Sequence, residues 1–413
     1  MAFTSPTRLG PPYHLLPTDL RVSLPDALRA DTPASPTLAD APLSWRDRFL
    51  GWRDALYAHP VFQKWAAELP ILRTITRIRS RAVFDLVSGF VYSQTLSACF
   101  ELGLFKMLAE GPQDLATLAR RTGMPADGLE RLLKAAMSLD LVQSRSRGRY
   151  GLGKLAGPLV HDTALAHMVA HHRHFYADLA NPLAMLRKQA GDTVLAKFWS
   201  YAEAARPQDI DAGNAAEYSG IMAETIPPLA ADVLDHYDLG RHRRLMDVGG
   251  GEGVFLAAAA QRHSALEVQL FDLPPVVARA AKRFEALGLA SRATMVGGNF
   301  HDDPLPTGAD VISLVRVLLD HSDTKARMIL RRVREALPPG GVLLVAEPVG
   351  GRPQTAPLAD AYFGFYLWAM GSGRARSETE HRAMLAEAGF STVRRVPTRT
   401  PFWTDLLVAT VEG

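Results

Sequence analysis

A cluster of four glycines directly after a short apolar run constrains the fold of this chain more than any other feature. The segment reads Leu245-Met-Asp-Val-Gly-Gly-Gly-Glu-Gly253, and an apolar helical pattern begins at Val254. Glycine has no β-carbon, so the backbone of such a loop turns sharply and approaches a ligand closely. A strand, a glycine loop and a helix in this order predict the ligand-binding edge of an open α/β sheet.

The segment after the glycine cluster alternates between short apolar runs and amphipathic helical patterns. This alternation is typical of an open, mainly parallel α/β sheet. The predicted strands are residues 244–248, 267–271, 293–296, 310–318 and 341–346, and the predicted helices are residues 254–262, 276–287 and 323–337.

The glycine cluster does not match two common nucleotide-binding patterns. Counted from Gly249, Val254 occupies the position of the third glycine in the dinucleotide fingerprint G-x-G-x-x-G. No Lys-Ser or Lys-Thr pair follows, so the loop is not a P-loop. The pattern therefore argues against NAD and against ATP.

Two carboxylates accompany the loop. Asp247 lies just before the glycines, where it suits a ligand ammonium group, and Gly249 and Gly251 allow the close approach of that ligand. Asp272 ends the next strand, where an acidic residue binds both hydroxyls of a ribose in other nucleoside-binding sheets. A nucleoside joined to an amino acid, without a pyrophosphate, fits this arrangement. The predicted cofactor is S-adenosyl-L-methionine.

The next two strands add further candidates for cofactor binding. The third strand ends at Gly297-Gly298-Asn299-Phe300, where Asn299 is placed to accept from an adenine amine and Phe300 to stack on the ring. The fourth strand carries Arg316, which is costly to bury without a carboxylate or a ligand partner.

The chain divides into five predicted regions. They are a proline-rich disordered leader (1–44), a basic aromatic helical extension (45–82), a winged-helix domain that opens with a long apolar helix from Val83 (83–160), a helical linker and substrate-pocket region (161–235), and the cofactor-binding domain (236–413).

The extension at residues 45–82 permits two interpretations. Trp45, Phe49 and Trp52 share one helical face among many arginines. Basic amphipathic helices of this kind bind anionic membrane surfaces. A face packed on the rest of the protein or on a dimer mate is the other interpretation, and we favour it.

The winged-helix pattern raises the question of DNA binding. Its second helix carries Asp127 and Glu130 against Arg131 and Lys134, so the charges that contact phosphates in such modules cancel here. We therefore expect packing and dimerisation rather than nucleic-acid binding.

Composition excludes several classes of protein. The 413 residues include one cysteine, Cys99, which excludes an internal disulfide and a cysteine-rich metal site and is expected to be a buried apolar residue. No apolar stretch is long enough to span a bilayer, and the first residues lack the features of a secretory signal. A cytoplasmic protein without a metal site is expected.

The residues from 85 to 413 resemble the class of O-methyltransferases that act on caffeate, acetylserotonin and related compounds. The resemblance rests on the glycine segment at 245–253 together with Phe271-Asp-Leu-Pro274, Gly298-Asn-Phe300, Val317-Leu-Leu-Asp-His-Ser-Asp323, Val345-Ala-Glu347 and Arg376-Ser377. It implies a Rossmann-like α/β methyltransferase domain and an N-terminal winged-helix domain that forms a homodimer and helps to close the partner's pocket. It also implies cofactor contacts for Gly249, Asp272, Gly298, Asn299, Phe300 and Arg316.

One departure from the family pattern concerns catalysis. Family members read Val-Leu-His-Asp-Trp, with the histidine as general base toward a phenol, whereas this chain has Leu319 at that position. Asp320 and His321 follow and remain as candidate proton acceptors, although a structural role is favoured for His321. Glu347 matches an acidic position of the family.

This loss and the N-terminal extension most resemble the carotenoid O-methyltransferases of purple photosynthetic bacteria, which act on hydroxyneurosporene and demethylspheroidene. The resemblance implies a hydrophobic small-molecule substrate with an aliphatic hydroxyl, and a protein that is cytoplasmic or peripheral to the photosynthetic membrane. A tertiary alcohol is a very weak acid, so positioning is expected to dominate catalysis. The alternatives are a phenolic or tetrapyrrole substrate, or a winged-helix regulator with a vestigial cofactor fold.

Overall fold

The computed structural model describes residues 44–187, 193–198, 212–401 and 403–413. The predicted leader therefore lies outside the described residues as far as position 43, and so do parts of the predicted pocket region at 188–192 and 199–211. The chain divides into two compact units, residues 1–87 and 88–413. A single helix runs across this division.

Three helices form the described part of the first unit. They are α1 (Trp45–Ala58), α2 (Pro60–Glu68) and α3 (Pro70–Glu101), the last of which continues into the second unit. Ser44 caps α1 by accepting from the backbone N–H of Asp47, and prolines at the first helical positions begin α2 and α3. Residues 45–82 are mainly helical, as predicted for the extension, but the apolar helix predicted from Val83 is not separate from it, because α3 runs without interruption from Pro70 to Glu101. The boundary predicted at 82/83 falls inside this helix.

A small helical domain with a three-stranded sheet opens the second unit. Its elements are α4 (Leu104–Ala109), β1 (Gln113–Asp114), α5 (Leu115–Thr122), α6 (Ala126–Ser138), β2 (Val142–Arg145) and β3 (Arg149–Leu152). Gly123 ends α5 in the left-handed conformation, as expected of a turn between two helices. Leu118, Leu129 and Leu133 are fully buried in its core. The predicted sequence of helix, turn, helix and hairpin is confirmed.

Further helices connect this domain to the large sheet. They are α7 (Thr163–Leu179), α8 (Pro182–Leu186), α9 (Val194–Phe198) and α11 (Ala212–His236). Asp162 and Asn181 cap α7 and α8 through their side chains. Helix α7 packs on α9, α11 and α15 (Phe363–Met370).

A seven-stranded sheet, counted within the described residues, forms the centre of the α/β domain. Its order is β11-β12-β8-β7-β4-β5-β6. The strands are β4 (Arg244–Val248), β5 (Glu267–Asp272), β6 (Ala293–Gly297), β7 (Val311–Val315), β8 (Val342–Glu347), β11 (Thr392–Val396) and β12 (Asp405–Thr410). The first five are parallel, and β12 and β11 join antiparallel. The predicted Rossmann-like α/β fold is correct.

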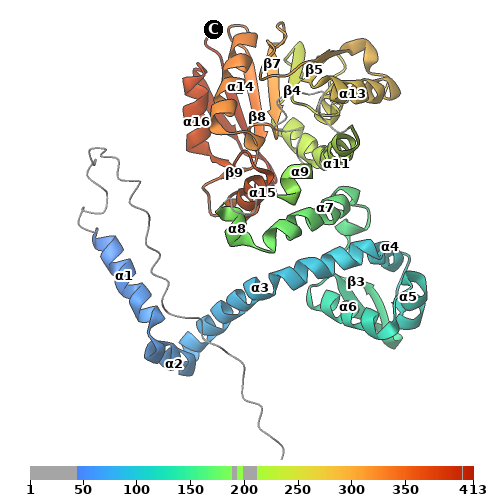
Figure 1. Cartoon of the computed structure of the whole chain (residues 1–413), viewed down its shortest axis with the longest axis vertical. Coiled ribbons are helices and arrows are strands. Elements are labelled where there is room, and N and C mark those ends of the chain that lie inside the picture. The colour runs from blue at the N-terminus through green and yellow to red at the C-terminus, as the bar shows by residue number, and fades with distance from the viewer. Residues whose placement is uncertain (1–43, 188–192, 199–211, 402) are drawn as a thin grey trace, which may run out of the picture. The chain divides into compact units, whose positions relative to one another are not determined.

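Helices cover both faces of this sheet (Figure 1). Helices α11, α12 (Val254–Arg262) and α13 (Pro274–Ala286) pack on one face, and α14 (Asp323–Ala336) and α16 (Glu378–Glu387) pack on the other. Strand residues alternate between the two cores, as Leu245 and Met246 do in β4. Two short strands, β9 (Val349–Gly350) and β10 (Arg376–Ser377), form a separate parallel pair, and β9 directly follows β8 in the sequence.

Strand β7 is shorter than predicted. The sequence predicts a strand over 310–318, but β7 ends at Val315 because Arg316 adopts a left-handed backbone (φ 55°). Residues Leu318–Asp320 then form a single 3₁₀ turn. The apolar run continues because these residues are buried, not because they are in the sheet.

Candidate active site

The strand order of the sheet reverses between β4 and β7. The chain passes from β4 outward to β5 and β6, and then returns to place β7 on the other side of β4. Ligands of open α/β sheets bind outside the carboxyl ends of the strands at such a switch point. The loops that follow β4, β6 and β7 contain all the predicted cofactor-binding residues except Asp247 and Asp272, which are in strands β4 and β5.

The glycine loop after β4 combines packing with open space. Gly249, Gly251 and Gly253 all have positive φ angles, between 58° and 71°. A β-carbon on Gly250 would lie 2.4 Å from the Asp247 carboxylate, and one on Gly253 would lie 2.8 Å from the ring of Phe284. At Gly251 nothing lies within 4 Å of that position. The loop is therefore tight on its inner side and open at Gly251, where a ligand has room to approach the backbone.

Asp247 is a fully buried carboxylate, and one of its oxygens lacks a partner among the described residues. Its Oδ1 accepts from the Ser313 hydroxyl at 2.6 Å, while its Oδ2 has no hydrogen-bond partner within the described residues. Burial raises the pKa of Asp247 to about 7. A buried oxygen without a donor is costly, so the site favours a ligand that brings a cationic N–H group.

Asp272 holds the loop and keeps acceptor capacity. Its Oδ2 accepts from the backbone N–H of Gly251 and its Oδ1 from that of Leu273, both at 2.7 Å. Burial raises the pKa of this carboxyl to about 6, against the opposing effect of these two hydrogen bonds. Each oxygen retains a lone pair, which suits the two hydroxyls of a ribose.

The loop after β6 has a more mixed role. A β-carbon on Gly298 would lie 2.6 Å from the ring of Phe271, so glycine is required for packing. The Asn299 amide donates to Asp302 and accepts from the backbone N–H of His301. The ring of Phe300 lies beside Gly249. Asn299 thus shapes its own loop, and its predicted adenine contact stays a prediction, as does stacking by Phe300.

Arg316 marks the end of β7. Its left-handed backbone is unusual for a residue with a β-carbon, and such conformations gather at functional sites. The guanidinium donates to the Thr225 hydroxyl at 3.0 Å, and its positive charge lowers the pKa of Asp320 against the larger effect of burial. Arg316 thus has a hydroxyl partner and a nearby carboxylate within the protein, as expected for an arginine at this position.

Two buried charged residues hold the loop 317–321. One oxygen of Glu347 accepts from the backbone N–H groups of Val317, Leu318 and Leu319. The fully buried Arg376 donates to the carbonyls of Leu318 and His321, at 2.6 and 2.7 Å. The sequence analysis did not predict this clamp, because both residues act on backbone groups that are distant in the sequence.

The three residues at the family's catalytic position differ in environment. Leu319 is 2% exposed and belongs to an apolar cluster with Phe175 and Tyr366. Burial raises the pKa of Asp320 to about 7. Burial lowers the pKa of His321 to about 3, and its ring packs edge-on against Phe300 at 5.3 Å between centroids. His321 is therefore neutral and a weak base, whereas Asp320 is close to half-ionised near neutral pH.

Two histidine–tyrosine pairs join α7 to α15 and to the turn that precedes it. His171 Nε2 lies 2.8 Å from the Tyr366 hydroxyl, and His172 Nε2 lies 2.8 Å from the Tyr362 hydroxyl. Burial lowers the pKa of His171 to about 4, so this pair is neutral. The sequence analysis placed both histidines in the helical linker and pocket region without naming either, and their consecutive positions at 171 and 172 were the signal available.

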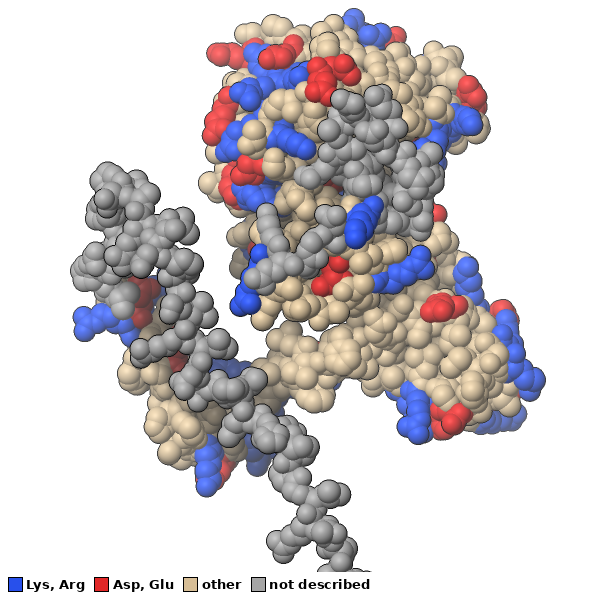
Figure 2. Space-filling view, viewed as in Figure 1, with Lys and Arg blue, Asp and Glu red and all other residues tan. Residues whose placement is uncertain are grey.

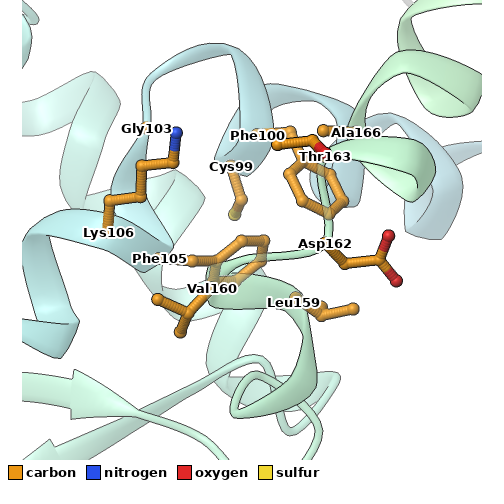
Figure 3. A pocket seen from close by; sticks show the side chains of 10 residues that line it. All are labelled: Cys99, Phe100, Gly103, Phe105, Lys106, Leu159, Val160, Asp162, Thr163 and Ala166. Carbon is orange, nitrogen blue, oxygen red and sulfur yellow. The ribbon is translucent and has the colours of Figure 1, made fainter. Parts of the chain in front are cut away.

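A separate pocket lies in the helical domain and is lined by residues from α3, α4, the turn Pro158–Val160 and α7 (Figure 3). Figure 3 shows Cys99 with Phe105, Leu159 and Val160, while Lys106 and Asp162 add charges. Cys99 is fully buried, as expected, and burial raises the pKa of its thiol to about 12. A protonated thiol is a poor nucleophile, so this pocket does not offer cysteine chemistry.

The chain matches two sequence families. The profile of the O-methyltransferase domain matches residues 176–391, and that of the O-methyltransferase dimerisation domain matches residues 84–162.

Individual relatives agree with these profiles. The chain is 42% identical to demethylspheroidene O-methyltransferase of Cereibacter sphaeroides over 84% of its own length and 91% of that protein. It is 33% identical to mouse acetylserotonin O-methyltransferase over 78% of its length and 86% of that protein. Among solved structures, human N-acetylserotonin methyltransferase in complex with S-adenosylmethionine superimposes with a TM-score of 0.69 at 27% identity, covering 81% of this chain and 98% of that one.

Proposed function

Because the chain belongs to the O-methyltransferase family and is an S-adenosylmethionine-dependent enzyme, we propose that it methylates the hydroxyl group of an acyclic hydroxylated carotenoid. Two relatives support the substrate class, since the proteins of Cereibacter sphaeroides and Rhodobacter capsulatus, at 42% and 41% identity, are both demethylspheroidene O-methyltransferases.

Leu319 is the observation that carries this proposal. It stands where phenol-methylating members of the family have a histidine base, and it is packed among apolar and aromatic side chains. A phenol is readily ionised by a neighbouring imidazole, whereas a tertiary aliphatic alcohol is not. An apolar residue at this position suits a polyene substrate better than a base would.

The residues of the carboxyl edge fit the cofactor. We assign the amino-acid end to Asp247, whose free Oδ2 needs a donor, and the ribose to Asp272, while Gly251 provides the open approach. When bound, S-adenosylmethionine supplies a methyl group on a positively charged sulfur. The protein then needs to align the hydroxyl oxygen with that methyl group and to exclude water.

Asp320 is the group that we propose to accept the hydroxyl proton. Burial holds its pKa at about 7, so it is available as a carboxylate near neutral pH, whereas His321, with a pKa of about 3, is a much weaker base. His321 is assigned a structural role against Phe300.

The protein is further proposed to act as a homodimer through its dimerisation domain and not to bind nucleic acid. On α6, Lys134 pairs with Glu130 at 2.8 Å, so its charge is already compensated. We propose that the enzyme is cytoplasmic. It would reach a polyene substrate dissolved in a bilayer from the surface of that membrane.

Product analysis tests the proposal. The protein is incubated with methyl-labelled cofactor in two parallel reactions. One contains a hydroxylated acyclic carotenoid, and the other contains the phenol N-acetylserotonin. We expect a labelled methyl ether of the carotenoid by mass spectrometry and little product from the phenol. Methylation of the phenol alone would assign the enzyme to the phenolic branch of the family. The Asp272→Ala variant serves as the inactive control.

A further inference from the structure

Helix α1 presents an apolar stripe to solvent. Trp45, Phe49, Trp52 and Leu56 fall within an arc of about 60° when successive residues are placed about 100° apart. Trp45 is 81% exposed, Phe49 55% and Trp52 62%, and α1 has no buried residue. The rings of Phe49 and Trp52 lie 6.0 Å apart. Large aromatic side chains are thus gathered on one face that the described residues of the chain do not cover.

The charges of α1 are ordered around this stripe. On the same projection Arg46 and Arg53 lie on one side of the apolar arc and Arg48 on the other. Asp47 and Asp54 lie on the opposite face. Arginines beside an apolar face and acids away from it are typical of a helix that lies in a membrane interface, where the long cationic side chains reach the lipid phosphates.

Helices α2 and α3 also expose apolar side chains together with basic ones. On α2, Val61 and Trp65 are 69% and 53% exposed. On α3, Arg73, Arg77 and Arg81 recur every four residues and so form one row along the helix. Figure 2 shows Lys and Arg side chains beside uncharged surface on this part of the molecule.

The segment 45–81 is far more basic than the rest of the chain. It contains eight Lys and Arg against three Asp and Glu, a net charge of +5, while the whole chain has +3. It also holds three of the six tryptophans. Tryptophan favours the interface between lipid and water, and basic segments bind anionic leaflets.

A second copy of the chain explains this surface less well. The dimerisation profile covers residues 84–162, so exposed apolar residues from Phe84 onward have an assigned partner, but those before position 82 do not. A two-fold contact through the segment 45–81 would also bring one +5 surface against another, and such like-charge contacts are unfavourable. No described helix is long and apolar enough to cross a bilayer, so the contact would be at the surface.

We propose that residues 45–81 bind the surface of an anionic lipid bilayer, with the aromatic stripe of α1 and Trp65 inserted among the lipids and the arginines at the phosphates. The contact gives the enzyme access to a bilayer-dissolved substrate and in this respect rests on the proposed function. The binding itself does not depend on which hydroxyl is methylated.

Vesicle flotation without substrate tests the binding. The full-length protein is mixed with vesicles of phosphatidylglycerol and phosphatidylcholine, and separately with phosphatidylcholine alone. We expect flotation with the anionic vesicles. In F49S/W52S the partition coefficient should fall by about tenfold or more, and in R46Q/R48Q by about fivefold per removed charge. All four side chains are exposed, so the fold should tolerate these changes.

Matched substitutions on other surfaces provide the controls. Leu287→Ser removes an apolar side chain that is 43% exposed, and R131Q/R331Q removes two exposed arginines. Neither should change flotation. The proposal is overturned if the wild-type protein fails to float with anionic vesicles, if the controls lose binding equally, or if light scattering shows that F49S/W52S converts a dimer to monomers. Methylation of detergent-dispersed carotenoid, measured separately, reports on the proposed substrate alone.

Discussion

The carboxyl edge of the large sheet and the N-terminal segment 45–81 use similar residue types in opposite ways. At the sheet edge, Phe271 and Arg376 are each 1% exposed, because Phe271 lies in the apolar core and Arg376 donates to backbone carbonyls and pairs with Asp323. In the segment 45–81, tryptophans and arginines are mostly exposed. The first region is packed within one chain and leaves only groups such as Asp247 Oδ2 for a ligand, whereas the described residues of the chain do not cover the second. Exposure of aromatic residues, and not their presence, separates a site from a docking surface.

Removal of the Glu347 side chain, at the carboxyl edge of the sheet, is expected to have the largest effect on stability. Glu347→Ala leaves three buried backbone N–H groups without their acceptor, and each such group costs about 1–3 kcal/mol. We expect the free energy of unfolding to fall by about 3 kcal/mol or more, as measured by urea denaturation, together with loss of methyl transfer.

Glu347→Gln is the matched control for this change. The amide retains an acceptor oxygen of the same reach, so the stability should fall by only about 1 kcal/mol. Equal losses in the two variants would show that the loop 317–321 does not depend on this acceptor.

Loss of the Asp272 carboxylate should be the next largest effect. Asp272→Ala removes both the proposed ribose acceptor and the hydrogen bond that fixes Gly251. We expect the affinity for S-adenosylhomocysteine, measured by calorimetry, to fall about 100-fold, or about 2.7 kcal/mol. Glu285→Ala, an exposed carboxylate on α13, should bind normally. Unchanged affinity in Asp272→Ala would remove the ribose assignment.

The pH dependence of cofactor binding sharpens the description of Asp247. Its pKa of about 7 means that the free protein holds a proton there below neutral pH, and a ligand ammonium group favours the ionised form. A proton must then leave on binding. The affinity should weaken by about tenfold per pH unit below pH 6 and should level off above pH 7. Calorimetry across this range measures it. Asp247→Asn should remove the slope between pH 6 and 7 and leave only the contribution of Asp272, whose pKa is about 6. A wild-type profile without a slope contradicts the ammonium assignment.

The smallest expected effect belongs to the segment 45–81. Trp52→Ala removes a side chain that is 62% exposed, so the free energy of unfolding should change by less than about 0.5 kcal/mol. Phe255→Ala, which removes a ring that is 2% exposed, should cost about 4 kcal/mol. Thermal or urea unfolding of the pair measures the contrast directly. A large loss of stability in Trp52→Ala would mean that the tryptophan is covered in the isolated protein.

Much of the α/β domain could be predicted because its signals are local. The predicted bounds of β4 and α12 agree with the structure at both ends, since the glycine loop between them fixes where the strand ends and the helix begins. The continuity of α3 from Pro70 to Glu101 was missed, because its composition changes from arginine-rich to apolar near Val83 while the helix does not end there.

The parts that could not be predicted depend on contacts between distant residues. The end of β7 at Val315 and the turn after it are set by Arg316, Glu347 and Arg376 together, and an apolar run alone cannot distinguish this loop from a strand. The pairing of His171 and His172 with tyrosines nearly two hundred positions later is likewise invisible in the sequence. Asp247 and Asp272 could be predicted because each lies at the end of a strand that the sequence pattern identifies.

The clamp around loop 317–321 has an evolutionary consequence. The Glu347 side chain accepts hydrogen bonds from backbone N–H groups of the loop, and the Arg376 side chain donates to backbone carbonyls of the loop. Neither interaction depends on which side chains the loop carries. A histidine and a leucine can therefore replace one another at position 319 while the main chain stays in place. Such a change of side chain at position 319 leaves the backbone anchors of the loop intact, so that the chemistry offered there can change without a change of the fold.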